Sequence, residues 1–117
     1  MKVAVFHDWS ALERDLRRSL PQRAVVTKRQ ELLSYDCDGL TMDRHAPPLA
    51  VLPEDTEQVA TVLRCCHAHG IPFVARGSGT GLSGGALVDQ QAWLVITSRK
   101  RPVIEVDLDN QRLTVQP

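Results

Sequence analysis

The chain has 117 residues, of which 43% are hydrophobic and 24% charged, values that suit one folded domain and exclude long disorder. Lysine plus arginine and aspartate plus glutamate each number 14, so the formal net charge is zero, which argues against binding to nucleic-acid phosphates. With aromatic residues at 4% and no apolar run near the length of a membrane span, base-stacking platforms and membrane-spanning helices are also disfavoured.

Regularly spaced leucines predict a first helix, which Asp8 or Ser10 can cap and Pro21 ends. The apolar stripe of this helix consists of Leu12, Leu16 and Leu20. Because the stripe is narrow and the segment is otherwise charged, we expect the helix to lie against another element rather than inside a core. A short β-like run follows at residues 24–27, and residues 34–43 are polar and rich in turn formers.

A proline pair at residues 47–48 marks a predicted boundary between a helical and irregular extension, residues 1–46, and a second region, residues 47–117. The second region reads as a strand, a helix, a strand, a glycine-rich loop and further strands that include a hairpin. This order of elements predicts an α+β fold. The chain stops shortly after an alternating strand, and we therefore expect the domain to continue past Pro117.

The strand–helix–strand segment carries clear boundary signals. Residues 49–52 are a continuous apolar run, which predicts a buried strand. Asp55, followed by Gln58, predicts the start of a helix, and Gly70 predicts its end. The apolar face of this helix consists of Val59, Val62, Leu63 and Cys66. Residues 71–75 predict a second strand, parallel to the first through a right-handed crossover.

Three more strands are predicted after the glycine-rich loop. The first is the apolar run Trp93–Thr97. The other two, Val103–Asp107 and Arg112–Val115, alternate apolar and polar residues, and the intervening Asp109 and Asn110 are turn formers. These two strands are therefore predicted to form a hairpin.

The most informative segment is the string RGSGTGLSGG, which spans Arg76–Gly85 and holds five glycines. Glycine is costly to order, and so many glycines indicate positive φ angles or a close approach of the backbone to a ligand. Successive amide groups without side chains form a nest that binds anions. The hydroxyls of Ser78, Thr80 and Ser83 and the cation of Arg76 favour a phosphate or pyrophosphate. A flexible surface loop is the alternative, and the apolar strands on either side argue against it.

Two familiar phosphate-binding motifs do not fit this loop. Residues 79–84 match G-x-G-x-x-G, but that motif must open a helix directly, and the gap before Trp93 is too short for a crossover helix. A Walker A loop is excluded because no Lys-Ser/Thr pair follows the glycines. The serines also lack the strand–Gly-x-Ser-x-Gly–helix context of a nucleophile elbow, so no catalytic residue is predicted in this chain.

The segment from Leu49 to Gln116 resembles the FAD-linked oxidases with a PCMH-type FAD-binding domain. The resemblance rests on VLPEDTEQVATVLRCCHAHGIPFVARGSGTGLSGGAL, on the closing TVQP and on the upstream YDCDGL, and it covers the chain from about residue 31. The string YDCDGL narrows the resemblance to one branch of that family, which includes the glycolate oxidase FAD-linked subunit and D-lactate dehydrogenase. The resemblance implies that the chain is the N-terminal half of such a domain, with FAD held between two α+β subdomains.

The resemblance also implies which residues bind the cofactor. In that family the amides of the glycine loop hold the FAD pyrophosphate. By matching position, the contacts are Arg76, Gly77, Ser78, Gly79, Thr80, Gly81, Leu82, Ser83 and Gly84, together with Pro53 where the adenine-side contacts begin. The resemblance further implies that the second flavin-binding half and the substrate and catalytic parts lie beyond this chain, and that an iron–sulfur subunit of a glycolate oxidase complex is a partner.

The function implied is therefore the FAD-binding portion of a flavin-dependent oxidoreductase that acts on a 2-hydroxy acid such as glycolate or D-lactate. Two alternatives remain open. One is a non-catalytic truncated remnant, or a split half-domain that needs a partner chain. The other is a generic nucleotide-binding module, which would bind NAD without a preference for FAD.

The cysteines indicate a reducing compartment. Cys37, Cys65 and Cys66 are odd in number and two are adjacent, which is not a disulfide framework and fits the cytoplasm. His7 and Asp8 interrupt any secretory signal at the start of the chain.

A metal site on the predicted helix is the other reading of these residues. Cys65 and His69 are four residues apart and could share a metal ion, but the sequence offers no second ligand pair, and no metal site is predicted.

Two charged segments have only structural interpretations. Asp36, Asp38 and Asp43 with Gly39 lack the spacing of a calcium loop and are predicted to form a capped polar turn, which the resemblance places near the edge of the flavin domain. The basic run Arg99–Arg101 is predicted to be a solvated turn, and contact with a partner chain is the alternative.

Overall fold

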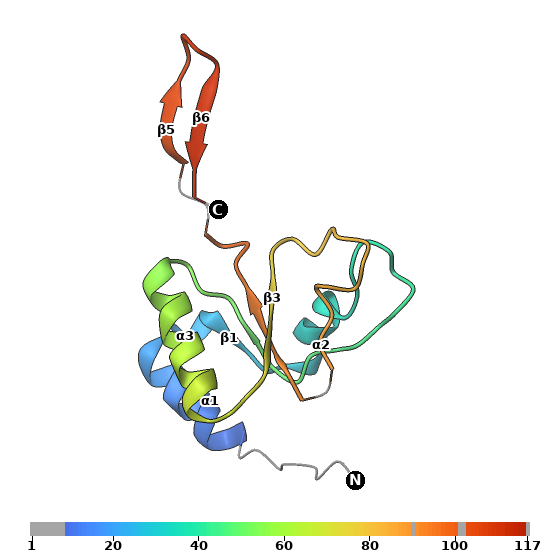
Figure 1. Ribbon diagram of the computed structural model, residues 1–117. Coiled ribbons are helices and arrows are strands. Elements are labelled where there is room, and N and C mark those ends of the chain that lie inside the picture. The colour runs from blue at the N-terminus through green and yellow to red at the C-terminus, as the bar shows by residue number, and fades with distance from the viewer. Residues whose placement is uncertain (1–8, 90, 101–102, 117) are drawn as a thin grey trace.

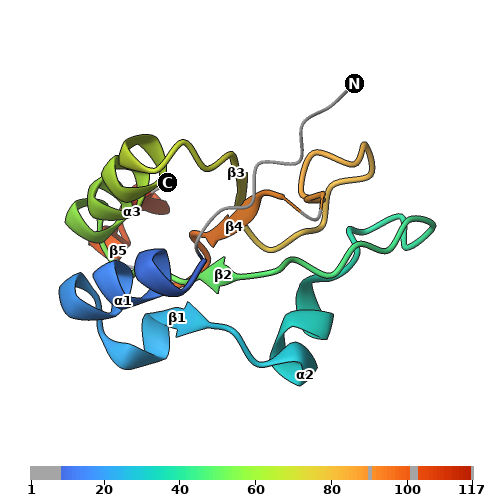
Figure 2. The same cartoon turned by 90° about the horizontal axis from the view of Figure 1, so that it is seen from below.

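The computed structural model describes residues 9–89, 91–100 and 103–116. In them a four-stranded sheet lies between helices and is followed by a separate hairpin, as Figures 1 and 2 show. The helices are α1 (Trp9–Ser19), α2 (Arg29–Leu32) and α3 (Thr56–Ala68), and the strands are β1 (Val25–Val26), β2 (Ala50–Val51), β3 (Phe73–Arg76), β4 (Trp93–Ile96), β5 (Val103–Asp107) and β6 (Arg112–Val115). The predicted α+β fold is confirmed. None of the described helices is long and apolar enough to span a bilayer.

The strands of the main sheet are ordered β1-β2-β4-β3. β4 runs parallel to both of its neighbours, and β1 pairs with β2 in the antiparallel sense. The predicted parallel direction of the two strands around α3 is therefore confirmed. β4 lies between them, however, so the connection through α3 passes over one strand position that the sequence order does not reveal.

Alternate side chains of the strands enter two separate cores. On one face, Val51, Trp93 and Val95 pack with α1 and α3. On the other face, Ala50, Leu52, Leu94 and Ile96 pack with Leu32 of α2 and with Val88 and Ala92 of the segment before β4. Figure 1 shows α1 and α3 together on one side of the sheet and α2 on the other. β4 is buried along its whole length because both faces of the sheet are covered.

The first helix is more deeply placed than its narrow stripe predicts. The helix lies against other elements, as expected, but its stripe also forms part of a core, because Leu12 and Leu16 are 2% and 1% exposed and pack in the cluster around Trp93. Its packing against α3 explains this, since the two helices together cover one face of the sheet. Of the two predicted caps, Asp8 lies outside the described residues and Ser10 lies inside the helix.

The boundaries of α3 follow the predicted signals. The Asp55 carboxylate accepts a hydrogen bond of 2.7 Å from the Gln58 amide, and Gln58 Oε1 accepts one of 3.1 Å from the Glu54 amide. The first bond is the N-cap bond of a capping box, whereas the second reaches the amide of the residue ahead of the cap instead of the Asp55 amide. At the other end, Gly70 adopts a φ of +65°, the left-handed conformation expected just after a helix.

Residues ahead of the proline pair belong to the same sheet as those after it. Val25 pairs with Val51, and the Leu52 amide donates to the Ala24 carbonyl at 2.7 Å. The stripe of α1 completes the core on one face. The division into residues 1–46 and 47–117 stays a prediction about domains, and in this structure the two segments share a sheet and both cores.

The predicted hairpin is confirmed. β5 and β6 pair in the antiparallel sense, and Asp107 accepts hydrogen bonds from the backbone and side-chain nitrogens of Asn110 in the turn. The hairpin projects away from the sheet (Figure 1). Its apolar side chains are exposed, from 51% at Val103 to 82% at Leu108.

Candidate cofactor site

The glycine loop leaves the sheet at the end of β3 and returns to it at β4. Its start is fixed to the neighbouring strand, because the Thr97 amide donates to the Arg76 carbonyl at 2.8 Å. The loop therefore begins at the carboxyl end of parallel strands, which is where open α/β sheets bind their ligands. Most of its backbone is open to solvent, with residues 80–85 all exposed.

The loop has room for a ligand at its backbone. A Cβ added at Gly77, Gly81, Gly84 or Gly85 would meet no other atom within 4 Å. Bare peptide groups that face open space are the components of an anion-binding nest. The hydroxyl residues Ser78, Thr80 and Ser83 stand in the same stretch and are exposed.

Arg76 turns inward, away from the open side of the loop. Its side chain is only 8% exposed and donates to the Cys37 carbonyl at 2.8 Å and to the Tyr35 carbonyl at 3.5 Å. The guanidinium also lies 5.9 Å from the centre of the Tyr35 ring. Among the described residues, no carboxylate lies within ion-pair distance of it. Its charge is thus not neutralised by an acidic neighbour and acts on the loop from beneath.

Gly79 is the position where the loop crosses this guanidinium. It has a φ of +72°, and a Cβ there would fall on the Arg76 side chain. Any other residue would be strained by its backbone conformation and would also collide with Arg76. This glycine lets the chain pass directly over a buried cation.

The Asp38–Gly39 turn holds the loop from its other side. The Gly39 amide donates to the Gly81 carbonyl at 2.9 Å, and Asp38 Oδ2 accepts from the Gly84 amide at 3.0 Å. A Cβ on Gly39 would lie 2.6 Å from the Thr80 carbonyl oxygen, so only glycine permits this approach. This link was not predicted. Its signal in the sequence is the acid–glycine pair in YDCDGL, which by itself predicts only a capped turn.

The predicted cofactor residues thus divide into three groups. Gly77 to Gly84 lie together in one open loop. Arg76 lies below the loop with its side chain directed inward. Pro53 lies after β2 and is less than 2% exposed, so its side chain offers no free surface in this structure. The assignment of these residues to a cofactor remains a prediction.

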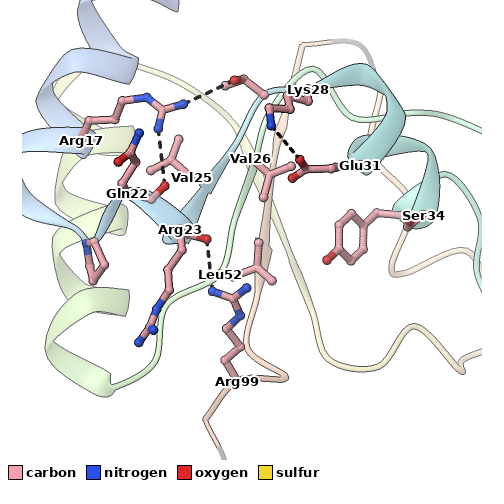
Figure 3. A pocket seen from close by; sticks show the side chains of 13 residues that line it. Arg17, Gln22, Arg23, Val25, Val26, Lys28, Glu31, Ser34, Leu52 and Arg99 are labelled. Atoms are coloured by element: carbon pink, nitrogen blue, oxygen red, sulfur yellow. Dashed lines mark hydrogen bonds and ion pairs between the residues drawn. The ribbon is translucent and has the colours of Figure 1, made fainter.

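A groove of about 880 Å³ beside β1 was not predicted (Figure 3). Its floor includes Val25, Val26 and Leu52, and four cations line it: Arg17, Arg23, Lys28 and Arg99. Each cation already has a carboxylate partner, at distances from 2.7 Å for Arg17 with Glu13 to 3.9 Å for Arg99 with Glu54. The groove is therefore a weaker candidate for an anion site than the glycine loop.

Arg99 has a definite place in this groove. It donates to the Arg23 carbonyl at 3.1 Å, as Figure 3 shows, so the turn after β4 is fastened to the segment before β1. Arg101, at the end of the same basic run, lies outside the described residues. The predicted solvated turn is thus half right, because Arg99 is exposed but bound.

The two thiols of α3 are poorly suited to act as nucleophiles. Burial raises the pKa of the Cys66 thiol to about 11 and, with a smaller contribution from Asp15, also raises the pKa of Cys65. A protonated thiol is a poor nucleophile and a poor metal ligand. His69 Nε2 lies 3.4 Å from the Asp15 carboxylate of α1. Across the described part of the chain, no group of three His, Cys, Asp or Glu side chains is arranged for a metal ion.

Solved structures with the same fold are longer chains, of which this one covers about a fifth. p-Cresol methylhydroxylase with bound substrate superposes with a TM-score of 0.74 at 22% identity, over 88% of this chain and 21% of that one. Alkyldihydroxyacetonephosphate synthase superposes with a TM-score of 0.76 at 17% identity, over 92% of this chain and 22% of that one. At these identities the likeness shows the fold alone.

Curated relatives are closer in sequence. The glycolate oxidase subunit GlcD of Escherichia coli (strain K12) is 39% identical over 102 residues, which is 87% of this chain and 20% of that protein. The D-lactate dehydrogenase of Archaeoglobus fulgidus is 38% identical over 63 residues, 54% of this chain and 14% of that protein. The chain thus spans about a fifth or less of the length of these relatives. The family model described as "FAD binding domain" matches residues 47–117, and this chain therefore belongs to that family of FAD-binding domains.

Proposed function

We propose that the chain is the FAD-binding portion of a flavin-dependent oxidoreductase that acts on a 2-hydroxy acid such as glycolate or D-lactate. The observation that carries the proposal is the open glycine loop, with a buried cation that has no acidic partner among the described residues lying directly beneath it. A pyrophosphate is the part of FAD that such a loop suits. The names of the relatives support the substrate class.

The loop residues would hold FAD in the following way. The backbone amides from Gly77 to Leu82 and the hydroxyls of Ser78 and Thr80 would donate to the pyrophosphate oxygens. Arg76 would stabilise the bound anion through its charge, without touching it. FAD supplies the redox chemistry when it is bound, and this chain supplies binding and orientation. The residues that act on the substrate would lie in further parts of the protein.

The proposed partner subunit and the proposed cellular compartment have weaker support than the cofactor. One relative is named as a subunit of glycolate oxidase, which supports assembly with further chains, and we extend the proposal to an iron–sulfur subunit of such a complex. The three cysteines, all free thiols, support a reducing compartment such as the cytoplasm.

The exposed hairpin bears on a second candidate, a split half-domain that needs a partner chain. With Ile104, Val106 and Leu113 about 60% exposed, β5 and β6 would need another layer of protein to cover them. Later parts of a longer chain, or the partner chain of a split half-domain, would cover such a surface. A general nucleotide-binding module is the third candidate, and it would bind NAD as well as FAD.

The proposal is tested by native mass spectrometry of the protein isolated from its own cells. We expect a mass that includes FAD, and we expect the Gly79→Val variant to lose it, because the new side chain would be strained at a φ of +72° and would collide with Arg76. Gly85→Ala, which meets nothing within 4 Å and lies outside the predicted cofactor residues, is the matched control and should retain FAD.

Each other outcome contradicts part of the proposal. Unchanged flavin content in Gly79→Val would refute the loop assignment. A wild-type protein without flavin would favour the remnant, and bound NAD without a preference for FAD would favour the general nucleotide-binding module.

A further inference from the structure

Asp38 is a buried acid with an unusual set of partners. Its side chain is 6% exposed, and its two oxygens accept hydrogen bonds of 3.0 Å from the Leu40 and Gly84 amides. Among the described residues, no cation lies within ion-pair distance of it. A buried carboxylate is costly unless it is hydrogen bonded, and here both bonds go to backbone amides. One of these amides belongs to the glycine loop, 46 residues further along the chain.

Three loop positions meet the Asp38–Gly39 turn. The Gly84 amide is bound by Asp38, the Gly81 carbonyl is bound by the Gly39 amide, and the Thr80 carbonyl oxygen packs against Gly39. The loop backbone would otherwise be free to adopt many conformations, because it is rich in glycine and exposed. These contacts restrict the loop to one of those conformations through groups of the protein itself.

Resting on the proposed FAD function, we propose that Asp38 is a positioning residue that sets the glycine loop in its anion-receptive shape before the cofactor arrives. The Gly84 amide is used by Asp38 and is not available to a phosphate. The pyrophosphate is therefore held by the amides ahead of Gly84, and Gly84 itself serves to anchor the loop. A loop that is already ordered loses less entropy on binding, so Asp38 raises cofactor affinity without touching the cofactor.

The first test is amide hydrogen exchange of the full chain without any added ligand. In Asp38→Ala we expect the Gly39 and Gly84 amides to exchange at least about tenfold faster than in the wild type, because both bonds to the loop are lost or loosened. The β4 amides should keep their protection. Asp38→Asn retains an oxygen acceptor and should recover at least half of the lost protection on a logarithmic scale.

Asp36→Ala is the matched control for this test. Asp36 is a buried acid of the same turn, but its carboxylate accepts from Arg44 at 3.2 Å and not from the loop. We expect wild-type exchange at Gly84 in this variant. Wild-type exchange at Gly84 in Asp38→Ala would overturn the proposal.

A second pair of variants applies if Asp38→Ala also loses β4 protection. In Gly39→Ala the new Cβ would lie 2.6 Å from the Thr80 carbonyl oxygen, so the loop would have to move away from the Asp38–Gly39 turn. Amide exchange at Gly84 should therefore accelerate. Gly77→Ala has open space and should not accelerate this exchange. Equal exchange in these two variants would overturn the proposal.

The last measurement separates positioning from cofactor binding itself. FAD affinity of the flavin-retaining protein should fall at least about fivefold in Asp38→Ala and recover in Asp38→Asn, while the visible spectrum of bound flavin stays the same. Faster loop exchange with unchanged FAD affinity would overturn the positioning role and leave the proposed function standing. A wild-type protein that binds no FAD would defeat the proposed function, and the exchange data would still decide whether Asp38 fixes the loop.

Discussion

The glycine loop and the β5–β6 hairpin are both exposed, yet they are held in opposite ways. The loop has small residues and no regular structure, but Asp38, Gly39 and Arg76 connect it to the body of the protein. The hairpin has regular strands and large apolar side chains, and β5 and β6 pair chiefly with each other. Exposure alone therefore does not report how firmly a segment is held. The partners of its backbone groups do.

The sheet is the common support of the two regions, and its loss gives the largest expected effect. Leu94 of β4 is 0% exposed, and Leu94→Ala should lower the free energy of unfolding by about 2–5 kcal/mol in a urea titration. The glycine loop should lose exchange protection with the sheet, while the hairpin should not. Leu113→Ala, at 59% exposure, is the control and should stay within about 0.5 kcal/mol of the wild type. Loss of hairpin protection in Leu94→Ala would show that the two regions unfold as one.

A smaller loss in the free energy of unfolding is expected when only the contacts that hold the glycine loop are removed. Arg76→Met removes the donors to the Cys37 and Tyr35 carbonyls and should cost about 1–3 kcal/mol in thermal or urea unfolding. Exchange should accelerate in residues 77–85 and not in the hairpin. Arg99→Met, which also removes a bond to a backbone carbonyl but at an exposed position, should cost less than half as much. Equal costs would mean that burial of Arg76 contributes nothing.

The smallest effect separates backbone strain from contact within the loop. Gly84 has a φ of +78° and open space around it, so Gly84→Ala should cost about 1–2 kcal/mol through strain alone. Gly81 has open space and no positive φ, so Gly81→Ala should be neutral or stabilise the protein by up to about 1 kcal/mol, because the unfolded chain becomes less flexible. Differential scanning calorimetry checks both. A stabilising Gly84→Ala would contradict the left-handed conformation.

Sequence reasoning succeeded where the signal is local. The cap at Asp55, the end of α3 at Gly70 and the hairpin turn at Asp109–Asn110 each depend on residues a few positions apart, and all three were predicted correctly. The glycine loop was also placed correctly between β3 and β4.

The failures concern contacts between distant residues. Nothing in a run of apolar residues states that β4 lies between β2 and β3, because each buried strand looks alike. The inward turn of Arg76 depends on carbonyls 39 and 41 residues earlier, and the bond of Asp38 to Gly84 spans 46 residues. The groove beside β1 likewise joins side chains from residues 17–35 with Leu52 and Arg99. No local spacing rule describes such pairs.

The bond between Asp38 and Gly84 bears on how this protein can be recombined with its relatives. A chimaera joined at the proline pair would take the glycine loop from one parent and the acid that binds it from the other. The parent that supplies the turn would then need glycine at position 39, because a Cβ there would lie 2.6 Å from the Thr80 carbonyl oxygen of the other parent's loop. The smallest exchangeable unit that carries a working loop therefore begins ahead of Tyr35, because the carbonyl of that residue is already one of the Arg76 contacts.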